Sequence, residues 1–220
     1  MDIRFEVASS LVLGPLLVVF AVVTGVQVWR DAWNGRRALL QMAVAVYAAA
    51  VLSLTIFPLN VTWGTYANQA PWIEQINFIP LIVADITMVP NVIMMIPAGF
   101  LLPLLSRRAT SAKATTLLTG LVSLGIEAAQ LLSYIALNNG RSVDVNDVVA
   151  NSLGGFIGYF LLTFALRSEA LRKPLLAASL PRSAALQEDR RRTTASPVVP
   201  APAPVPAPVP APVPAPGLRR

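Results

Sequence analysis

The sequence of 220 residues contains no cysteine and no histidine, and only 13% of its residues are charged. Disulfide scaffolds, thiol nucleophiles, Ser-His-Asp hydrolysis and zinc sites of the usual Cys/His type are therefore excluded. Soluble domains carry about a quarter charged residues, whereas here 55% of the residues are hydrophobic. The composition indicates a protein whose solvent is lipid. Any chemistry falls to carboxylates, amides, hydroxyls and arginine, and we predict no cofactor.

Several apolar runs are long enough to cross a bilayer core, which takes roughly 20 helical residues. These runs cover residues 8–29, 39–59, 86–105, 115–135 and 145–166. Backbone N–H and C=O groups find no water in lipid, so each run is expected to be a helix. The predicted fold class is therefore an all-α integral membrane protein with five transmembrane helices.

The segments between the apolar runs lie alternately on one side of the membrane and on the other. Lysine and arginine are distributed unevenly between these two sides. One side holds Arg30, Arg36, Arg37, Arg107, Arg108, Lys113, Arg167, Arg172, Lys173 and Arg182, and the other holds Arg4 and Arg141. Basic connections stay in the cytoplasm, so we expect the N-terminus outside and the C-terminus cytoplasmic. Because the basic residues bracket the apolar runs, we predict membrane lipids as partners and no nucleic acid.

The chain divides into three predicted regions. Residues 1–38 form an N-terminal transmembrane helix and a cytoplasmic link, and residues 39–167 form the main transmembrane bundle. Residues 168–220 are predicted to be a cytoplasmic tail, first basic and then rich in Pro and Ala. The Pro-Ala and Pro-Val pairs of residues 196–217 cannot bury a core and favour polyproline II or disorder. Two roles for this segment remain open: a cytoplasmic spacer, and a docking site for a proline-binding partner.

Polar residues recur inside the fourth and fifth apolar runs. At about 100° per residue, six polar residues of the fourth run share one arc: Thr116, Thr119, Ser123, Glu127, Gln130 and Tyr134. Asp144, directly before the fifth run, shares another arc with Asp147 and Asn151 of that run. An acid at the centre of a span costs about 2.5–3.5 kcal/mol on insertion scales and usually marks a site. Glu127 is therefore the first candidate.

Depth along the helices brings these residues together. At a rise of about 1.5 Å per residue, Glu127 and Asn151 come to one level below the outer ends of their runs, and Asn91 of the third run lies nearby. We predict a polar pocket in the outer half of the bundle, roofed by Arg141 and by residues 60–85.

Simpler roles compete for some of these residues. Ser123 and Gln130 are the kind of side chain that bonds one spanning helix to another. Asp144 has the position of an N-cap, with Asp147 in the acidic first turn that follows. Helix packing is predicted for small or kinking residues of the third and fifth runs, namely Pro97, Gly99, Gly154, Gly155 and Gly158.

A set of motifs spans residues 77–159. In order, these are Asn77 and Pro80, then Asn91 with IPAGFLLP at 96–103, then SLGIEAAQ at 123–130, then GRSVDVNDVVANSLGGFIGY at 140–159. In this order they resemble the VanZ-like family of small bacterial multi-pass membrane proteins. The resemblance implies a bacterial cell membrane location and a role at the cell envelope. The family takes its name from a protein that raises resistance to the glycopeptide teicoplanin. Membership in the family does not imply a particular chemical reaction.

Three functional hypotheses follow, and a proton-coupled carrier ranks last among them because the polar residues cluster in the outer half of the bundle. The first is a non-enzymatic protein whose outward pocket binds an amphiphile, either a lipid-linked envelope precursor or a glycopeptide. Its candidate ligand-binding residues are Asn77, Asn91, Ser123, Glu127, Gln130, Arg141, Asp144, Asp147 and Asn151. The alternative is a membrane enzyme acting on a lipid-linked substrate, with Glu127 as general acid or base and Asp144 with Asp147 as a second carboxylate pair. A divalent ion on oxygen ligands would suit that chemistry.

Overall fold

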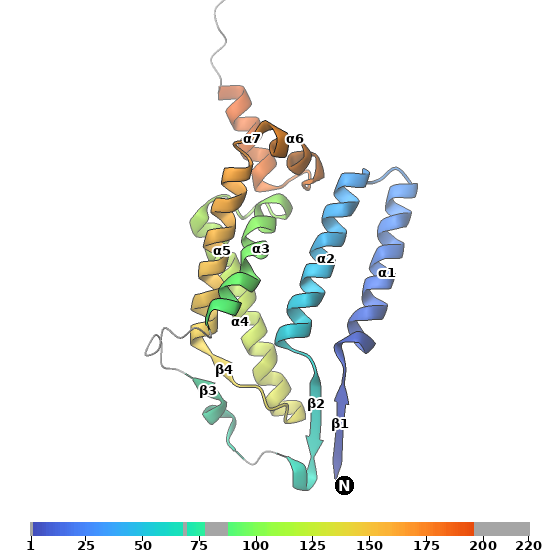
Figure 1. Cartoon of the computed structure of the whole chain (residues 1–220), viewed down its shortest axis with the longest axis vertical. Coiled ribbons are helices and arrows are strands. Elements are labelled where there is room, and N and C mark those ends of the chain that lie inside the picture. Colours follow the sequence, from blue (N-terminus) through green and yellow to red (C-terminus); the bar gives the residue numbers. More distant parts are fainter. Residues whose placement is uncertain (1, 68–69, 78–87, 196–220) are drawn as a thin grey trace, which may run out of the picture.

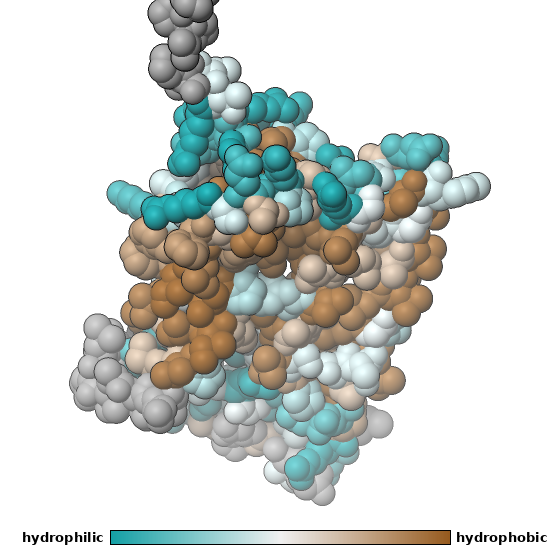
Figure 2. All heavy atoms as spheres, turned by 45° about the horizontal axis from the view of Figure 1, so that its top comes forward, coloured by the Kyte–Doolittle hydropathy of each residue, from teal (hydrophilic) through white to brown (hydrophobic). Residues whose placement is uncertain are grey.

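The computed structural model describes residues 2–67, 70–77 and 88–195. Its long helices are α1 (Ser9–Trp29), α2 (Gly35–Thr55), α3 (Met88–Leu105), α4 (Ala112–Leu137) and α5 (Val145–Ala165), which run side by side (Figure 1). All five are long and apolar enough to cross a membrane. The predicted all-α membrane fold is confirmed, and Figure 2 shows a band of apolar residues below a hydrophilic end.

Two helices begin earlier than the apolar runs predicted, because polar residues cap them. The Asn34 side chain accepts a hydrogen bond from the Arg37 N–H at 2.8 Å, so α2 starts at Gly35. The Ser111 hydroxyl likewise accepts from the Ala114 N–H at 3.2 Å and starts α4. At its other end α4 stops at Asn138, whose φ of 53° is the left-handed conformation that often ends a helix.

Short strands gather at the end of the bundle where the N-terminus lies, here called the strand end (Figure 1). β1 (Ile3–Val7) pairs antiparallel with β2 (Leu59–Trp63), and β3 (Ile76–Asn77) pairs in parallel with β4 (Val143–Asp144). Two 3-10 turns, η1 (Gly64–Tyr66) and η2 (Trp72–Gln75), lie between β2 and β3. None of these strands was predicted from the sequence. The β3–β4 register sets Asn77 opposite Asp144.

The opposite end, here called the basic end, is closed by two further helices. α6 (Glu169–Ala178) and α7 (Ala184–Ala195) follow α5. The backbone N–H of Leu180 donates to the Leu104 carbonyl at 2.9 Å, and that of Ala184 donates to the Ser106 carbonyl at 3.0 Å. The basic part of the predicted tail is therefore folded against the bundle. The polyproline prediction for residues 196–217 lies outside the described residues.

Helix α3 packs most extensively against α5, and glycine makes the close approach possible. A Cβ atom on Gly99 would overlap the backbone carbonyl of Gly155, and one on Gly158 would overlap that of Ile96. Gly154 and Gly155 also lie buried in α5. Pro97, grouped with these residues from sequence, is instead exposed on α3.

Candidate functional site

The polar stripe of α4 faces the interior of the bundle. Ser123, Glu127 and Gln130 are 0%, 4% and 8% exposed. The exposed side chains of the same helix include Leu121 and Leu132. This arrangement puts polar groups where other helices can pair them and leaves apolar groups for lipid, as expected for a membrane bundle.

Glu127 and Asn77 both bind Asp144, the residue before α5. The Glu127 Oε2 atom accepts a hydrogen bond from the backbone N–H of Asp144 at 3.1 Å. The Asp144 side chain accepts from the Asn146 N–H at 2.8 Å through Oδ1, so the N-cap interpretation is confirmed. Its Oδ2 atom accepts from Asn77 Nδ2 at 3.1 Å. Asp144 thus joins β3, α4 and α5.

Two more pairs connect α5 to its neighbours. Asn91 of α3 donates through Nδ2 to Asp147 Oδ1 at 2.5 Å. Asn151 donates through Nδ2 to Ser123 Oγ at 2.7 Å. Counting depth from sequence placed Asn151 level with Glu127, but the structure pairs it with Ser123, about one turn deeper. The difference arises because α5 does not begin level with the outer end of α4. It begins level with Glu127, whose carboxylate accepts from the Asp144 N–H, so Asn151 lies deeper than Glu127.

Two buried amide oxygens in this region have no hydrogen-bond partner among the described residues. They are Gln130 Oε1 and Asn151 Oδ1. The other end of each amide is bonded, since Gln130 Nε2 donates to the Thr55 carbonyl at 2.8 Å. Buried polar atoms are normally paired, so these oxygens are open to a donor.

Arg141 binds the end of α2 rather than a carboxylate. Its guanidinium donates to the carbonyl of Leu54 at 3.3 Å and to that of Phe57 at 2.6 Å. A cation at the C-terminal end of a helix also complements the helix dipole. The ion pairs formed by the described residues all lie within residues 169–192, so Arg141 takes part in none of them.

A pocket of about 460 Å³ opens beside Arg141 at the strand end, and we refer to it as the strand-end pocket. It is lined by Pro58, Asn60, Gln130, Asn139, Gly140, Arg141, Ser142 and Asp147. Of the candidate residues, Gln130, Arg141 and Asp147 therefore line it. Ser123, Glu127 and Asn151 are buried in the α4–α5 interface, and Asn77 and Asn91 join that network through the two aspartates.

Asn60 and Asn139 line the strand-end pocket but were not candidates from sequence. Asn139 is 1% exposed. Its Oδ1 atom lies 3.4 Å from both the backbone nitrogen and the Nδ2 atom of Asn60, and its own Nδ2 donates to Ser133 Oγ. The run Asn-Asn-Gly after α4 is typical of an exposed turn, so the sequence carried no signal of burial.

Within the described residues, no group of three or more acidic side chains is placed to hold a metal ion.

The fold and this network define a multi-pass α-helical membrane protein whose polar side chains gather between its spanning helices near one end. The family model described as VanZ/LLP1 matches residues 44–166. The chain belongs to this family, and the match runs from within α2 to the end of α5. No curated protein and no solved structure matches the chain.

Proposed function

We propose that this VanZ/LLP1 protein lies in a bacterial cell membrane with its strand end outside, and that the strand-end pocket binds the head group of an envelope amphiphile. The ligand is a lipid-linked wall precursor or a lipid-tailed glycopeptide of the teicoplanin type. The excess of lysine and arginine at the basic end supports this orientation.

The observation that carries the proposal is the chemistry of the pocket walls. Arg141 presents a guanidinium that no carboxylate pairs within the described residues, and it can donate further hydrogen bonds to a phosphate or carboxylate. Gln130 and Asp147 line the same pocket and supply an amide and a carboxylate. A head group that combines an anion with hydroxyl and amide donors satisfies all three residues.

The apolar faces beside the pocket suit a hydrocarbon tail. Leu132 and Ile135 lie within five residues of Gln130 on α4 and are 64% and 54% exposed. In a membrane these side chains contact acyl chains. A ligand can thus keep its tail in the bilayer while its head group enters the pocket. Binding of this kind would reduce the pool of free precursor or antibiotic and supports a role in glycopeptide resistance.

Affinity measurements on the full chain in lipid nanodiscs test the proposal. The probes are a lipid-linked wall precursor and teicoplanin, and the variants are Arg141→Gln and Asp147→Asn. Loss of one hydrogen bond to a charged group weakens binding about tenfold or more. Arg108→Gln, which removes the same charge at the basic end, is the matched control and should bind as the wild type does. Equal affinity in all four proteins, or no binding by the wild type, would contradict the proposal.

One observation favours the enzymatic alternative. Glu127 accepts from the Asp144 N–H, and Asp147 lies in the first turn of α5, so two carboxylates lie at the same end of α5. A proton-transfer role for Glu127 requires an ionisable side chain. If the wild type turns over a lipid-linked substrate and Glu127→Gln does not, although its fold is intact, the proton-transfer role is established. Turnover retained in that variant would exclude it.

A further inference from the structure

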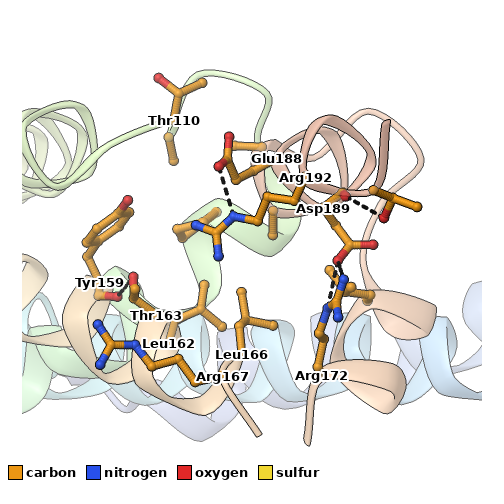
Figure 3. Close-up of a pocket in the computed structure, with 16 residues that line it drawn as sticks. Thr110, Tyr159, Leu162, Thr163, Leu166, Arg167, Arg172, Glu188, Asp189 and Arg192 are labelled. Atoms are coloured by element: carbon orange, nitrogen blue, oxygen red, sulfur yellow. Dashed lines mark hydrogen bonds and ion pairs between the residues drawn. The ribbon is translucent and has the colours of Figure 1, made fainter. Parts of the chain in front are cut away.

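A second pocket lies at the basic end, where the last turns of α5 meet α6 and α7 (Figure 3). Its volume is about 610 Å³. Apolar residues such as Leu162 and Leu166 at the end of the spanning helix line it, and so do five charged residues of the chain after Ala165: Arg167, Arg172, Glu188, Asp189 and Arg192. The pocket therefore lies where the apolar span gives way to the basic end.

Arginines outnumber acids in this pocket, and one arginine is unpaired. Arg172 pairs with Asp189, with its Nε atom 2.7 Å from Oδ1. Arg192 pairs with Glu188, with Nε and Oε1 3.0 Å apart. The third arginine, Arg167, forms no ion pair within the described part of the chain. Both acids are thus engaged, and the charge of Arg167 is left for another anion.

Figure 3 shows how the unpaired arginine lies. The Arg167 side chain extends along the end of α5 on the side of the pocket where Tyr159 and Thr163 lie, and Arg192 reaches across from α7 toward the same side. Guanidinium groups from just after α5 and from α7 therefore both line the pocket. Arginine pairs are well suited to phosphate, whose oxygens accept forked hydrogen bonds.

An apolar groove on the outer face of α5 adjoins this pocket. Phe156, Phe160 and Phe164 line it and are 41%, 51% and 71% exposed. Thr163 and Arg167 line both the groove and the pocket. A molecule with its charge at Arg167 can therefore lay an apolar chain against the phenylalanines without crossing a polar surface.

We propose that this pocket and groove together bind one acidic glycerophospholipid of the leaflet at the basic end. Arg167 and Arg192 hold the phosphate, and one acyl chain packs along the phenylalanines of α5. Anionic lipids attract basic segments next to spanning helices, and the groove adds an apolar match that a free anion cannot use. The site is independent of the strand-end pocket, because Arg167 and Asp147 lie at opposite ends of α5.

Lipid binding to the full chain in detergent micelles tests the inference, read as retained lipid in native mass spectrometry and as a change in thermal unfolding. The probes are phosphatidylglycerol, phosphatidylcholine with the same acyl chains, and inorganic phosphate. We expect phosphatidylglycerol to bind most tightly. Arg167→Gln should weaken it about fivefold, the effect of one arginine near an anionic membrane surface. Arg108→Gln, at the same end but outside the pocket, is the matched control and should retain wild-type binding.

A second variant tests the groove without changing any charge. Thr163→Trp fills the boundary between pocket and groove, and we expect it to lose phosphatidylglycerol while Arg167 remains. The inference is overturned if phosphatidylcholine binds as well as phosphatidylglycerol, or if Arg108→Gln and Arg167→Gln weaken binding equally. It is also overturned if inorganic phosphate alone gives the full effect, or if Thr163→Trp binds the lipid as the wild type does.

Discussion

Glu127 of α4 accepts a hydrogen bond at 3.1 Å from the backbone N–H of Asp144, the residue that caps α5. The first N–H groups of a helix have no partner within the helix, and here a buried carboxylate from a neighbouring span meets the N–H at the cap. The side chain of Asp144 binds Asn77 of β3 at the same place. This contact fixes how α5 enters the bundle beside the strand-end pocket.

Replacing Glu127 separates its acceptor role from its charge. Glu127→Ala leaves the Asp144 N–H without its partner, and we expect the free energy of unfolding to fall by about 1–3 kcal/mol. Glu127→Gln retains a carbonyl acceptor at the same place and should lose less than half of that. Denaturant unfolding of the full chain in mixed micelles, followed by circular dichroism, measures both. Equal losses in the two variants would mean that the charge, and not the hydrogen bond, stabilises the contact.

Gly99 should tolerate no side chain. A Cβ there overlaps the backbone of Gly155, which cannot rotate away as a side chain would. We expect Gly99→Ala to lower the free energy of unfolding by about 1–3 kcal/mol, as overpacking generally does. Gly125 has nothing within 4 Å of the corresponding position, so Gly125→Ala is the matched control. If both variants unfold like the wild type, the close α3–α5 approach is not required for stability.

The bond between Ser123 and Asn151 should be worth a measurable coupling energy. Interhelical polar pairs in membrane proteins contribute about 0.6 kcal/mol on average and up to about 1.7. A double-mutant cycle with Ser123→Ala and Asn151→Ala should give a coupling in this range. The control cycle pairs Ser123→Ala with Thr163→Ala at the far end of α5, and its effects should add. A zero coupling in the first cycle would show that the 2.7 Å contact contributes nothing to stability.

The absence of cysteine makes the orientation testable by labelling single cysteines. Thr65 lies exposed at the strand end and Arg108 lies exposed at the basic end. In intact bacterial cells an impermeant maleimide should modify Thr65→Cys, and Arg108→Cys should react only after the membrane is opened. The reverse pattern would invert the orientation and place the strand-end pocket in the cytoplasm.

The spanning helices and the inward stripe of α4 follow from sequence because lipid leaves the chain few choices. A run of apolar residues must be helical there, and the periodicity of Ser123, Glu127 and Gln130 sets them on one face. The aspartates of α5 are similarly local, since Asp144 caps the helix it precedes.

Contacts between distant segments were not predictable in this way. Arg141 binds carbonyls at the end of α2, and Asn139 binds Asn60. In both cases the two partners lie far apart along the chain, and no sequence motif links them. The pairing of β1 with β2 also depends on α1 and α2 bringing both strands to one end of the bundle. Helices α6 and α7 pack because the ends of α3 and α5 offer Leu104 and Leu162, a surface visible only once the bundle is built.

Protection of a single cysteine tests the proposed ligand site most directly. Ser142 lines the strand-end pocket and is exposed, so Ser142→Cys should react readily with maleimide in the full chain in nanodiscs. Thr65→Cys, at the same end but outside the pocket, is the control. We predict that a lipid-linked wall precursor or teicoplanin slows labelling of Ser142→Cys and leaves Thr65→Cys unchanged. Unchanged labelling of Ser142→Cys while the ligand is bound to the protein would contradict the account.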